Sequence, residues 1–234
     1  MEKESRFSHE SEQKPLKTLT FLGRNTEGIL SDAKTNLEEL GEINVIARDG
    51  DKLEAPSGLQ KTGVSDFTPD QNFDYIIIAN GGTSQQLLPT IKKLVEQGIK
   101  FKAYDLQRDG VAQVMETPSI QVGEKELKER EEKEPQLILF LGNNTEGILN
   151  DALKQFGRET KAMVISREND RLQPPEGLQS ETVGTFEPEE GKKYIVIANG
   201  GTSQQLLPVI SKLLEKNIPF EAWDLQRDGA NKVW

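Results

Sequence analysis

Polar residues at the ends of predicted strands carry the side chains that could do chemistry in this chain. The segment from Ile78 to Pro89 reads IANGGTSQQLLP, and it recurs without change from Ile197 to Pro208. Asparagine, threonine, serine and glutamine side chains donate and accept hydrogen bonds. A glycine turn that opens a helix also presents backbone N–H groups to an anion. The motif is therefore typical of a cradle for a phosphate-bearing ligand.

Two further polar motifs recur at the same spacing of 119 residues (199 − 80 for the two motif asparagines). They are DLQRDG at residues 105–110 and 224–229, and NTEG at residues 25–28 and 144–147. The helix bodies differ freely, since residues 34–44 share nothing with residues 153–163. Core packing does not require identical polar residues in exposed loops, because solvent would accept many substitutes. The repeats therefore predict one polar site that is present twice.

The residues that we assign to ligand binding share these strand-end positions. They are Gly23, Asn25, Thr26, Asn80, Gly81, Gly82, Thr83, Gln85, Asp105 and Gln107 in the first half, and Gly142, Asn144, Thr145, Asn199, Gly200, Gly201, Thr202, Gln204, Asp224 and Gln226 in the second. Structural roles stay open beside this one. The glycine pairs can serve only to make a tight turn, and Thr83 and Ser84 can cap a helix with or without a ligand. Arg108 can simply pair with Asp109.

Composition excludes several classes of function. The chain has 234 residues, a formal net charge of −10 and a pI near 4.9, which argues against a generic coat for duplex nucleic acid. There are no cysteines, and the single histidine, His9, lies outside both repeats. Cysteine nucleophiles, disulfides and histidine-based triads are therefore excluded. No apolar run matches a membrane span and no signal-peptide core is present, so we expect a cytoplasmic protein with no membrane partner.

Each half of the chain predicts the element order β-α-β-loop-β-α-β. In the first half, buried strands are expected at residues 19–22, 43–47, 74–79 and 100–104, with helices after the first and third strands. This alternation predicts an α/β fold of two tandem Rossmann-like units. Each unit would be a four-stranded parallel sheet of order 2-1-3-4 with flanking helices. The switch point then falls between the first and third strands, where open α/β sheets bind ligands.

The domain boundaries follow from the repeat and from charge. We expect a polar tail over residues 1–17, a first repeat over 18–115, a charged linker over 116–136 and a second repeat over 137–234. The long polar loops at residues 48–72 and 167–191 are of a length typical of lids or binding loops. Arg48 recurs in them as Arg167. Whether the two repeats pair within one chain or between chains is left open by the sequence.

Two nucleotide motifs are absent. The first strand–helix turn lacks the G-x-G-x-x-G dinucleotide fingerprint, and no G-x-x-x-x-G-K-[ST] phosphate loop occurs. NAD-dependent redox chemistry and ATP hydrolysis are therefore disfavoured. A neutral cradle of Asn, Thr, Ser and Gln with one Arg suits a small nucleotide ligand better than a metal, so we expect no metal and no cofactor.

The second half of each unit resembles a known family. Asp74 to Gly82 and Gly98 to Leu106, with their counterparts Lys193 to Gly201 and Asn217 to Leu225, are similar to the CRISPR-associated Rossmann-like (CARF-type) proteins, and most similar to the small ring nucleases that handle cyclic oligoadenylates. The resemblance implies a pair of units about a two-fold axis, with a cyclic ligand across the joint. A tandem duplication would make that pair an intramolecular pseudo-dimer. The turns lack the histidine or lysine that would support cleavage.

If the ligand is cleaved, the resemblance implies a metal-independent ring nuclease in CRISPR antiviral defence. The 2′-hydroxyl of the ligand would attack the adjacent phosphate while the protein orients it and stabilises charge. Ser84, Ser203, Arg108 and Arg227 are the catalytic candidates, and Asp105 and Asp224 would position a base edge or the hydroxyl.

Other functions remain open at this stage. A non-catalytic nucleotide sensor or sponge would use the same site, and the lack of a general base favours it. A nucleotide-sugar binding or transferase-like protein is a further alternative, although its donor and acceptor domains would need less similar pockets. A structural pseudo-dimer without a ligand is the last, and further homo-oligomerisation is left open.

Overall fold

The structure, a computed structural model, describes residues 14–80, 83–107, 110–119, 134–226 and 229–234. In the described part of the first half, the elements are β1 (Leu16–Phe21), α1 (Thr26–Asn36), β2 (Glu42–Ala47), β3 (Gln60–Gly63), β4 (Asp74–Ile78), α2 (Ser84–Glu96), β5 (Phe101–Gln107) and β6 (Gly110–Glu116). In the second half they are β7 (Gln136–Phe140), α3 (Thr145–Phe156), β8 (Ala162–Ser166), β9 (Gln179–Thr182), β10 (Tyr194–Ile197), α4 (Ser203–Glu215), β11 (Phe220–Gln226) and β12 (Gly229–Lys232).

The two halves form two separate, equivalent sheets. The first has the strand order β3-β2-β1-β4-β5-β6 and the second has β12-β11-β10-β7-β8-β9. Neighbouring strands are parallel except for the pairs β5–β6 and β11–β12, which are antiparallel. The predicted α/β class with two repeated Rossmann-like sheets is confirmed. The predicted four-stranded, wholly parallel sheet is wrong, because each sheet has six strands and an antiparallel edge.

The strands that were not predicted, β3 and β6 in the first half, have weak hydrophobic patterns for physical reasons. Strand β3 has the polar sequence QKTG and lies within the predicted loop at residues 48–72. It is an edge strand that pairs with β2 through backbone groups, so it needs no apolar run. Strand β6 follows β5 directly, and its sequence, GVAQVME, has only two adjacent buried residues, Val114 and Met115. Its hydrophobic pattern is therefore too weak to predict a strand.

The two helices of each half cover opposite faces of its sheet. In β4, Tyr75 and Ile77 belong to the same buried cluster as Leu88 of α2, whereas Ile78 belongs to a cluster with Ile29 of α1. Successive strand residues point to opposite faces. Each half is therefore a three-layer α/β/α unit, and the carboxyl ends of its parallel strands share one edge.

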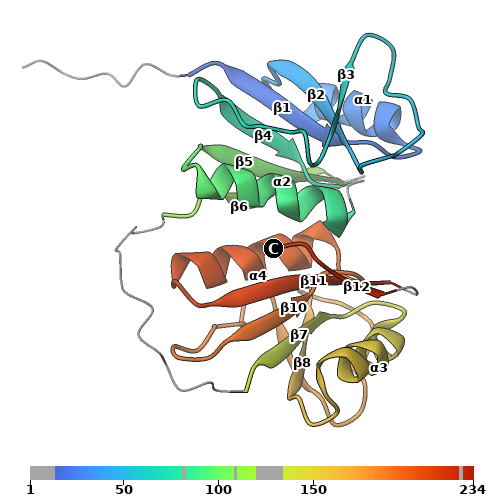
Figure 1. Ribbon diagram of the computed structural model, residues 1–234, viewed down its shortest axis with the longest axis vertical. Helices are drawn as coiled ribbons and strands as arrows, with labels where there is room; N and C mark the ends of the chain where they lie inside the picture. The colour runs from blue at the N-terminus through green and yellow to red at the C-terminus, as the bar shows by residue number, and fades with distance from the viewer. Residues whose placement is uncertain (1–13, 81–82, 108–109, 120–133, 227–228) are drawn as a thin grey trace, which may run out of the picture.

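The halves pack against each other within the single chain. Figure 1 shows one sheet above the other, with α2, β5 and β6 of the first half and α4, β11 and β12 of the second at the middle of the molecule. One buried cluster contains Leu88 and Met115 from the first half together with Ile210 and Val233 from the second. The hydrophobic core is thus continuous across the joint.

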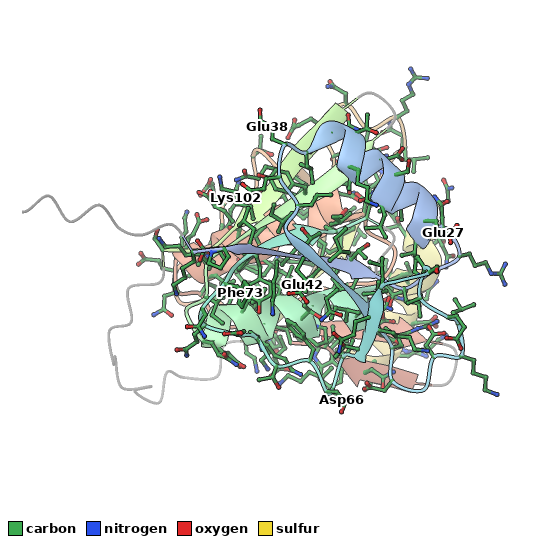
Figure 2. All side chains as sticks on the ribbon, turned by 90° about the horizontal axis from the view of Figure 1, so that it is seen from above. Glu27, Glu38, Glu42, Asp66, Phe73 and Lys102 are labelled. Carbon is green, nitrogen blue, oxygen red and sulfur yellow. The ribbon has the colours of Figure 1, made fainter. Side chains whose placement is uncertain are left out.

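Charged side chains lie near both ends of α1 (Figure 2). Seen from above, Glu27 lies at one end of α1 and Glu38 beyond its other end (Figure 2).

Strand β1 begins at Leu16, inside the predicted polar tail, while residues 1–13 and most of the predicted linker lie outside the described residues. Within the described ranges, none of the helices combines the length and the apolar character needed to span a bilayer.

Candidate functional site at the joint between the halves

Two reciprocal hydrogen bonds join the halves at the residues singled out in the sequence. Ser84, the first residue of α2, donates its hydroxyl to the carboxylate of Asp224 in β11. Ser203, the first residue of α4, donates to the carboxylate of Asp105 in β5. The IANGGTSQQ motif of each half therefore contacts the DLQRDG motif of the other half. Sequence analysis nominated these residues, but it did not predict that they pair across the joint.

Burial dominates the electrostatics of Asp105. The residue is only 7% exposed, and desolvation raises the pKa of its carboxyl group above the ordinary value. The Ser203 hydroxyl and the nearby positive charge of Arg167 lower that pKa and offset part of the burial effect. Asp224 is equally buried, at 4% exposed. Each carboxylate contacts the first residue of a helix in the opposite half, where backbone N–H groups favour negative charge.

The turn before each of these helices is held by a buried glutamine. The backbone N–H of Thr83 donates to Gln86 Oε1 at 3.2 Å, which forms one arm of a capping box. Gln86 Nε2 donates to the carbonyl oxygens of Leu22 and Ile46, at 3.3 and 3.2 Å. Gln205 makes the same contacts in the second half. Gln86 and Gln205 therefore have a structural role. The preceding glutamines, Gln85 and Gln204, are only partly buried and remain candidates for ligand binding.

The motif asparagines hold the end of the neighbouring strand. Asn80 Nδ2 donates to the carbonyl oxygen of Leu106 at 2.7 Å, and Asn199 both donates to and accepts from the backbone of Leu225. These bonds fix the backbone next to Asp105 and Asp224. Asn80 and Asn199, which were assigned to ligand binding, thus position the carboxylates through backbone contacts.

The threonines of the NTEG motifs are also engaged locally. Thr26 Oγ1 accepts a hydrogen bond from the Gly23 N–H at 2.8 Å and donates to the Gly23 carbonyl oxygen at 2.7 Å. Thr145 and Gly142 repeat this arrangement. Asn25 and Asn144 occupy the helix N-cap positions, but neither side chain makes a capping hydrogen bond. Both asparagine residues are exposed.

The second glycine pair is required by close packing. Gly200 has a φ of +91°, and a Cβ added there would lie 2.3 Å from Cδ1 of Ile148. A Cβ on Gly201 would lie 2.6 Å from the Phe140 ring, and one on Gly142 would lie 2.7 Å from the Gly200 carbonyl oxygen. The turns after β7 and β10 are therefore in contact, which brings the two predicted polar turns together.

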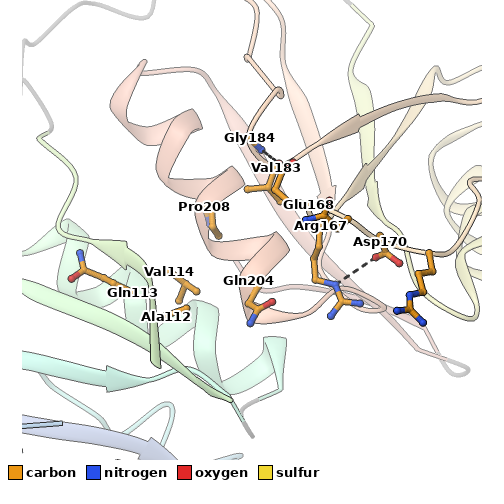
Figure 3. Close-up of a pocket in the computed structure, with 12 residues that line it drawn as sticks. Ala112, Gln113, Val114, Arg167, Glu168, Asp170, Val183, Gly184, Gln204 and Pro208 are labelled. Atoms are coloured by element: carbon orange, nitrogen blue, oxygen red, sulfur yellow. Dashed lines mark hydrogen bonds and ion pairs between the residues drawn. The ribbon is translucent and has the colours of Figure 1, made fainter. Parts of the chain in front are cut away.

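A cleft of about 750 Å³ opens at the joint, and one of the residues that line it is Gln204, which follows Ser203 (Figure 3). One wall is β6 of the first half, and the opposite wall is formed by α4 and the loops after β8 and β9 of the second half. Its lining residues are Ala112, Gln113, Val114, Arg167, Glu168, Asn169, Asp170, Arg171, Val183, Gly184, Gln204 and Pro208. Of the predicted site residues that the structure describes, only Gln204 is among them. The cleft exists only because the two halves are paired.

Arg167 and Arg171 are two cationic residues among the cleft residues that the sequence did not assign to the site. The available signal was the internal repeat, because Arg48 recurs as Arg167 and Lys52 recurs as the cation Arg171. These loops lie outside the strand-end motifs on which the predicted site rests. In the described part of the chain, Asp170 is the residue that Arg167 hydrogen-bonds, through Nε at 3.5 Å. This bond uses only Nε, so the terminal nitrogens of the Arg167 guanidinium group are available for an additional anionic partner.

Several of the predicted site residues fall outside the described part of the chain. Gly81, Gly82, Arg108 and Arg227 lie outside the described residues, as do the side chains of Gln107 and Gln226. Thr83 and Thr202 are exposed N-cap residues at the starts of α2 and α4. Among the described residues, no group of three or more His, Cys, Asp or Glu side chains is arranged to hold a metal ion.

The geometry offers hydrogen-bond donors, two buried carboxylates and a cleft lined by two arginines and two acidic residues at one joint. Fold and site together define a Rossmann-like α/β protein with two repeated sheets and a polar joint between them. No family model, no curated protein and no solved structure matches the chain.

Proposed function

We propose that the protein binds a phosphate-bearing nucleotide signal across the joint, and that a cyclic oligoadenylate is the class of ligand it takes. The reciprocal Ser84–Asp224 and Ser203–Asp105 bonds carry the proposal. Reciprocal contacts of this kind are what a two-fold axis between equivalent units requires. Two equivalent half-sites about such an axis suit a ligand that is itself built of repeated units.

The chemistry of the joint supports an anionic ligand beside the serines. Each carboxylate already occupies the anion-favouring position at the start of a helix, so ligand phosphates would lie next to these pairs. Arg24 follows β1, Arg48 follows β2, and Arg167 follows β8, so cations accompany the carboxyl ends of the strands in a chain whose net charge is −10. Arginine suits this role because its planar guanidinium group binds phosphate through paired hydrogen bonds.

Cleavage of the ligand is the second part of the proposal. The 2′-hydroxyl would lose its proton to a base as its oxygen attacks the adjacent phosphorus, and the 5′-oxygen would leave and take up a proton, which opens the ring and yields a 2′,3′-cyclic phosphate and a 5′-hydroxyl. Asp105, whose raised pKa makes its carboxylate a better base than a solvated one, would lie closest to this chemistry. Arg108 and Arg227 would stabilise the phosphate charge.

A non-catalytic sensor or sponge is the competing function, and one observation favours it. Ser84 and Ser203, the serines nominated for catalysis, each donate to a carboxylate of the opposite half. Serines that donate to these carboxylates help to hold the two halves together. A protein that only binds the ligand needs no catalytic group in addition to them.

The test is to mix the purified full chain with cyclic tri-, tetra- and hexa-adenylate. Calorimetry should give one ligand per chain for at least one ring size, and mass spectrometry should detect a linear product if the ring is cut. Recovery of intact ligand from the denatured complex would assign the sponge function. Absence of binding to all three rings would refute the proposal.

A further inference from the structure

The loops after β2 and β8 share a motif beyond the single arginine. Residues 48–60 read RDGDKLEAPSGLQ and residues 167–179 read RENDRLQPPEGLQ. Both fit the pattern R-x-x-D-(K/R)-L-x-x-P-x-G-L-Q. The repeated positions include a cation, an aspartate and a leucine in one short exposed segment. A solvated loop that only connects two strands has no need to keep this combination.

The aspartate of the motif holds the leucine in the same way in both loops. The Leu53 N–H donates to Asp51 Oδ1 at 3.0 Å, and the Leu172 N–H donates to Asp170 Oδ1 at 3.2 Å. Each loop therefore contains an Asx turn that fixes the backbone of the leucine. Thus the loops present their leucine and its preceding cation in an ordered conformation.

The two leucines are exposed although they are large and apolar. Leu53 is 44% exposed and Leu172 is 39% exposed, and they are the exposed large hydrophobic residues in the described part of the chain. A single exposed leucine needs no explanation. Two at equivalent positions, each beside a cation and each fixed by the same turn, indicate a surface that covers an apolar or planar group of a ligand.

The cleft links this loop to the joint. Arg167 and Arg171 line it, and Leu172 follows Arg171 directly. Figure 3 shows Arg167 extending from its loop on the side of the cleft opposite Val114 of β6, with Gln204 between the two elements. The positive charge of Arg167 also reaches the carboxyl group of Asp105. A ligand in the cleft would therefore lie next to the Ser203–Asp105 pair.

We infer that these two loops bind nucleotide units, with Arg167 and Arg48 contacting phosphate groups and Leu172 and Leu53 covering the face of a base. The ligand class is a nucleoside monophosphate unit, because such a unit combines an anionic group with a planar apolar ring. The identification of that unit as part of a cyclic oligoadenylate rests on the proposed function. The assignment of the loops does not.

The experiment compares three variants of the full chain with the wild type. They are the double variants R48A/R167A and L53S/L172S, and the control R158A, which removes an exposed arginine from the turn between α3 and β8. The probes are cyclic tetra-adenylate by calorimetry, and adenosine 5′-monophosphate and inorganic pyrophosphate by amide NMR. Thermal unfolding of each variant verifies that it is folded.

The expected result separates phosphate binding from base binding. R48A/R167A should bind cyclic tetra-adenylate at least about ten-fold more weakly, because charge-assisted hydrogen bonds are lost, whereas R158A should bind as the wild type does. L53S/L172S should weaken binding of the two adenine compounds and leave pyrophosphate binding unchanged. Wild-type affinity in a folded R48A/R167A protein would overturn the inference, as would a defect of L53S/L172S confined to self-association.

The experiment distinguishes failure of the proposed function from failure of the loop assignment. If no cyclic adenylate binds but monophosphate and pyrophosphate shift the amide signals of residues 48–53 and 167–172, the cyclic ligand is wrong and the loop assignment stands. If neither probe shifts those signals, the loop assignment is wrong.

Discussion

Replacing Ser203 with alanine tests whether the reciprocal bonds hold the two halves together. The variant removes the hydroxyl that donates to Asp105, and it leaves a carboxylate that is 7% exposed without that donor. Ser211 provides a matched control on the same helix. Its hydroxyl donates to the carboxylate of Glu215 at 2.8 Å, but this bond is exposed to solvent. The two substitutions therefore remove the same type of bond in two different environments.

The difference in burial sets the magnitude. A hydrogen bond to a charged group contributes about 1.5–3 kcal/mol when it is buried. The higher helix propensity of alanine returns about 0.5 kcal/mol. We therefore expect Ser203→Ala to lower the free energy of unfolding by about 1–2.5 kcal/mol. For the exposed Ser211 the two terms nearly cancel, and the change should stay within about 0.5 kcal/mol.

Urea unfolding at pH 7, monitored by circular dichroism, measures both changes. For a chain of this length the Ser203→Ala change corresponds to a fall in Tm of roughly 2–10 °C. Ser84→Ala should behave in the same way through Asp224. If Ser203→Ala and Ser211→Ala had equal effects, the Ser203 bond would not stabilise the joint, and the reasoning from burial would be refuted.

Two other perturbations have signs that follow from the structure. The pKa of Asp105 lies above its ordinary value of 3.8 because of burial, so its contribution to stability is present below pH ~3.8 and is lost as the pH rises through the folded-state pKa. Asp105→Asn cannot ionise, so its stability relative to the wild type should improve between pH 4 and pH 7; a relative loss over that range in urea unfolding would contradict the burial effect. Lys93 Nζ donates to the carbonyl oxygens of Val64, Ser65 and Phe67 at 2.7, 3.1 and 2.7 Å. Lys93→Met should therefore cost about 2–4 kcal/mol in urea unfolding, whereas Lys92→Met, which breaks only an exposed ion pair at 3.8 Å, should cost less than about 0.5 kcal/mol.

The central part of the fold was predictable because its signals are local. The apolar run at Tyr75 to Ile78, the glycine turn after it and the periodic leucines of α2 each indicate one element, and the repeat shows them twice. Strands β3 and β6 could not be predicted in this way. Strand β3 has no apolar run and pairs with β2 through backbone groups, and the buried residues of β6, Val114 and Met115, form too short a run to indicate a strand.

The sequence predicted which residues belong to the candidate site, but it did not predict which of them pair with each other. Identical polar motifs identified Ser84, Asp105 and their counterparts, and the structure brings these residues together at one joint. The pairing could not be read from the sequence, because it depends on how two finished sheets pack. Several motif residues have local roles instead, as the bonds of Thr26 and Asn80 show. A repeated polar residue can therefore mark a turn as readily as a ligand contact.

Joining the two halves in one chain has a consequence for the joint. Each Ser–Asp bond needs both halves, so in two separate chains the joint would depend on protein concentration. A linked pair has a fixed and high effective concentration, which keeps the joint assembled at any dilution. The linkage also allows the walls beside the two half-sites to diverge. Gln113 of β6 lines the described cleft, whereas the equivalent residue of β12 is Lys232, which forms an ion pair with Glu221 at 3.3 Å. Because the walls beside the two half-sites differ in this way, the half-sites should differ in affinity even for a symmetric ligand.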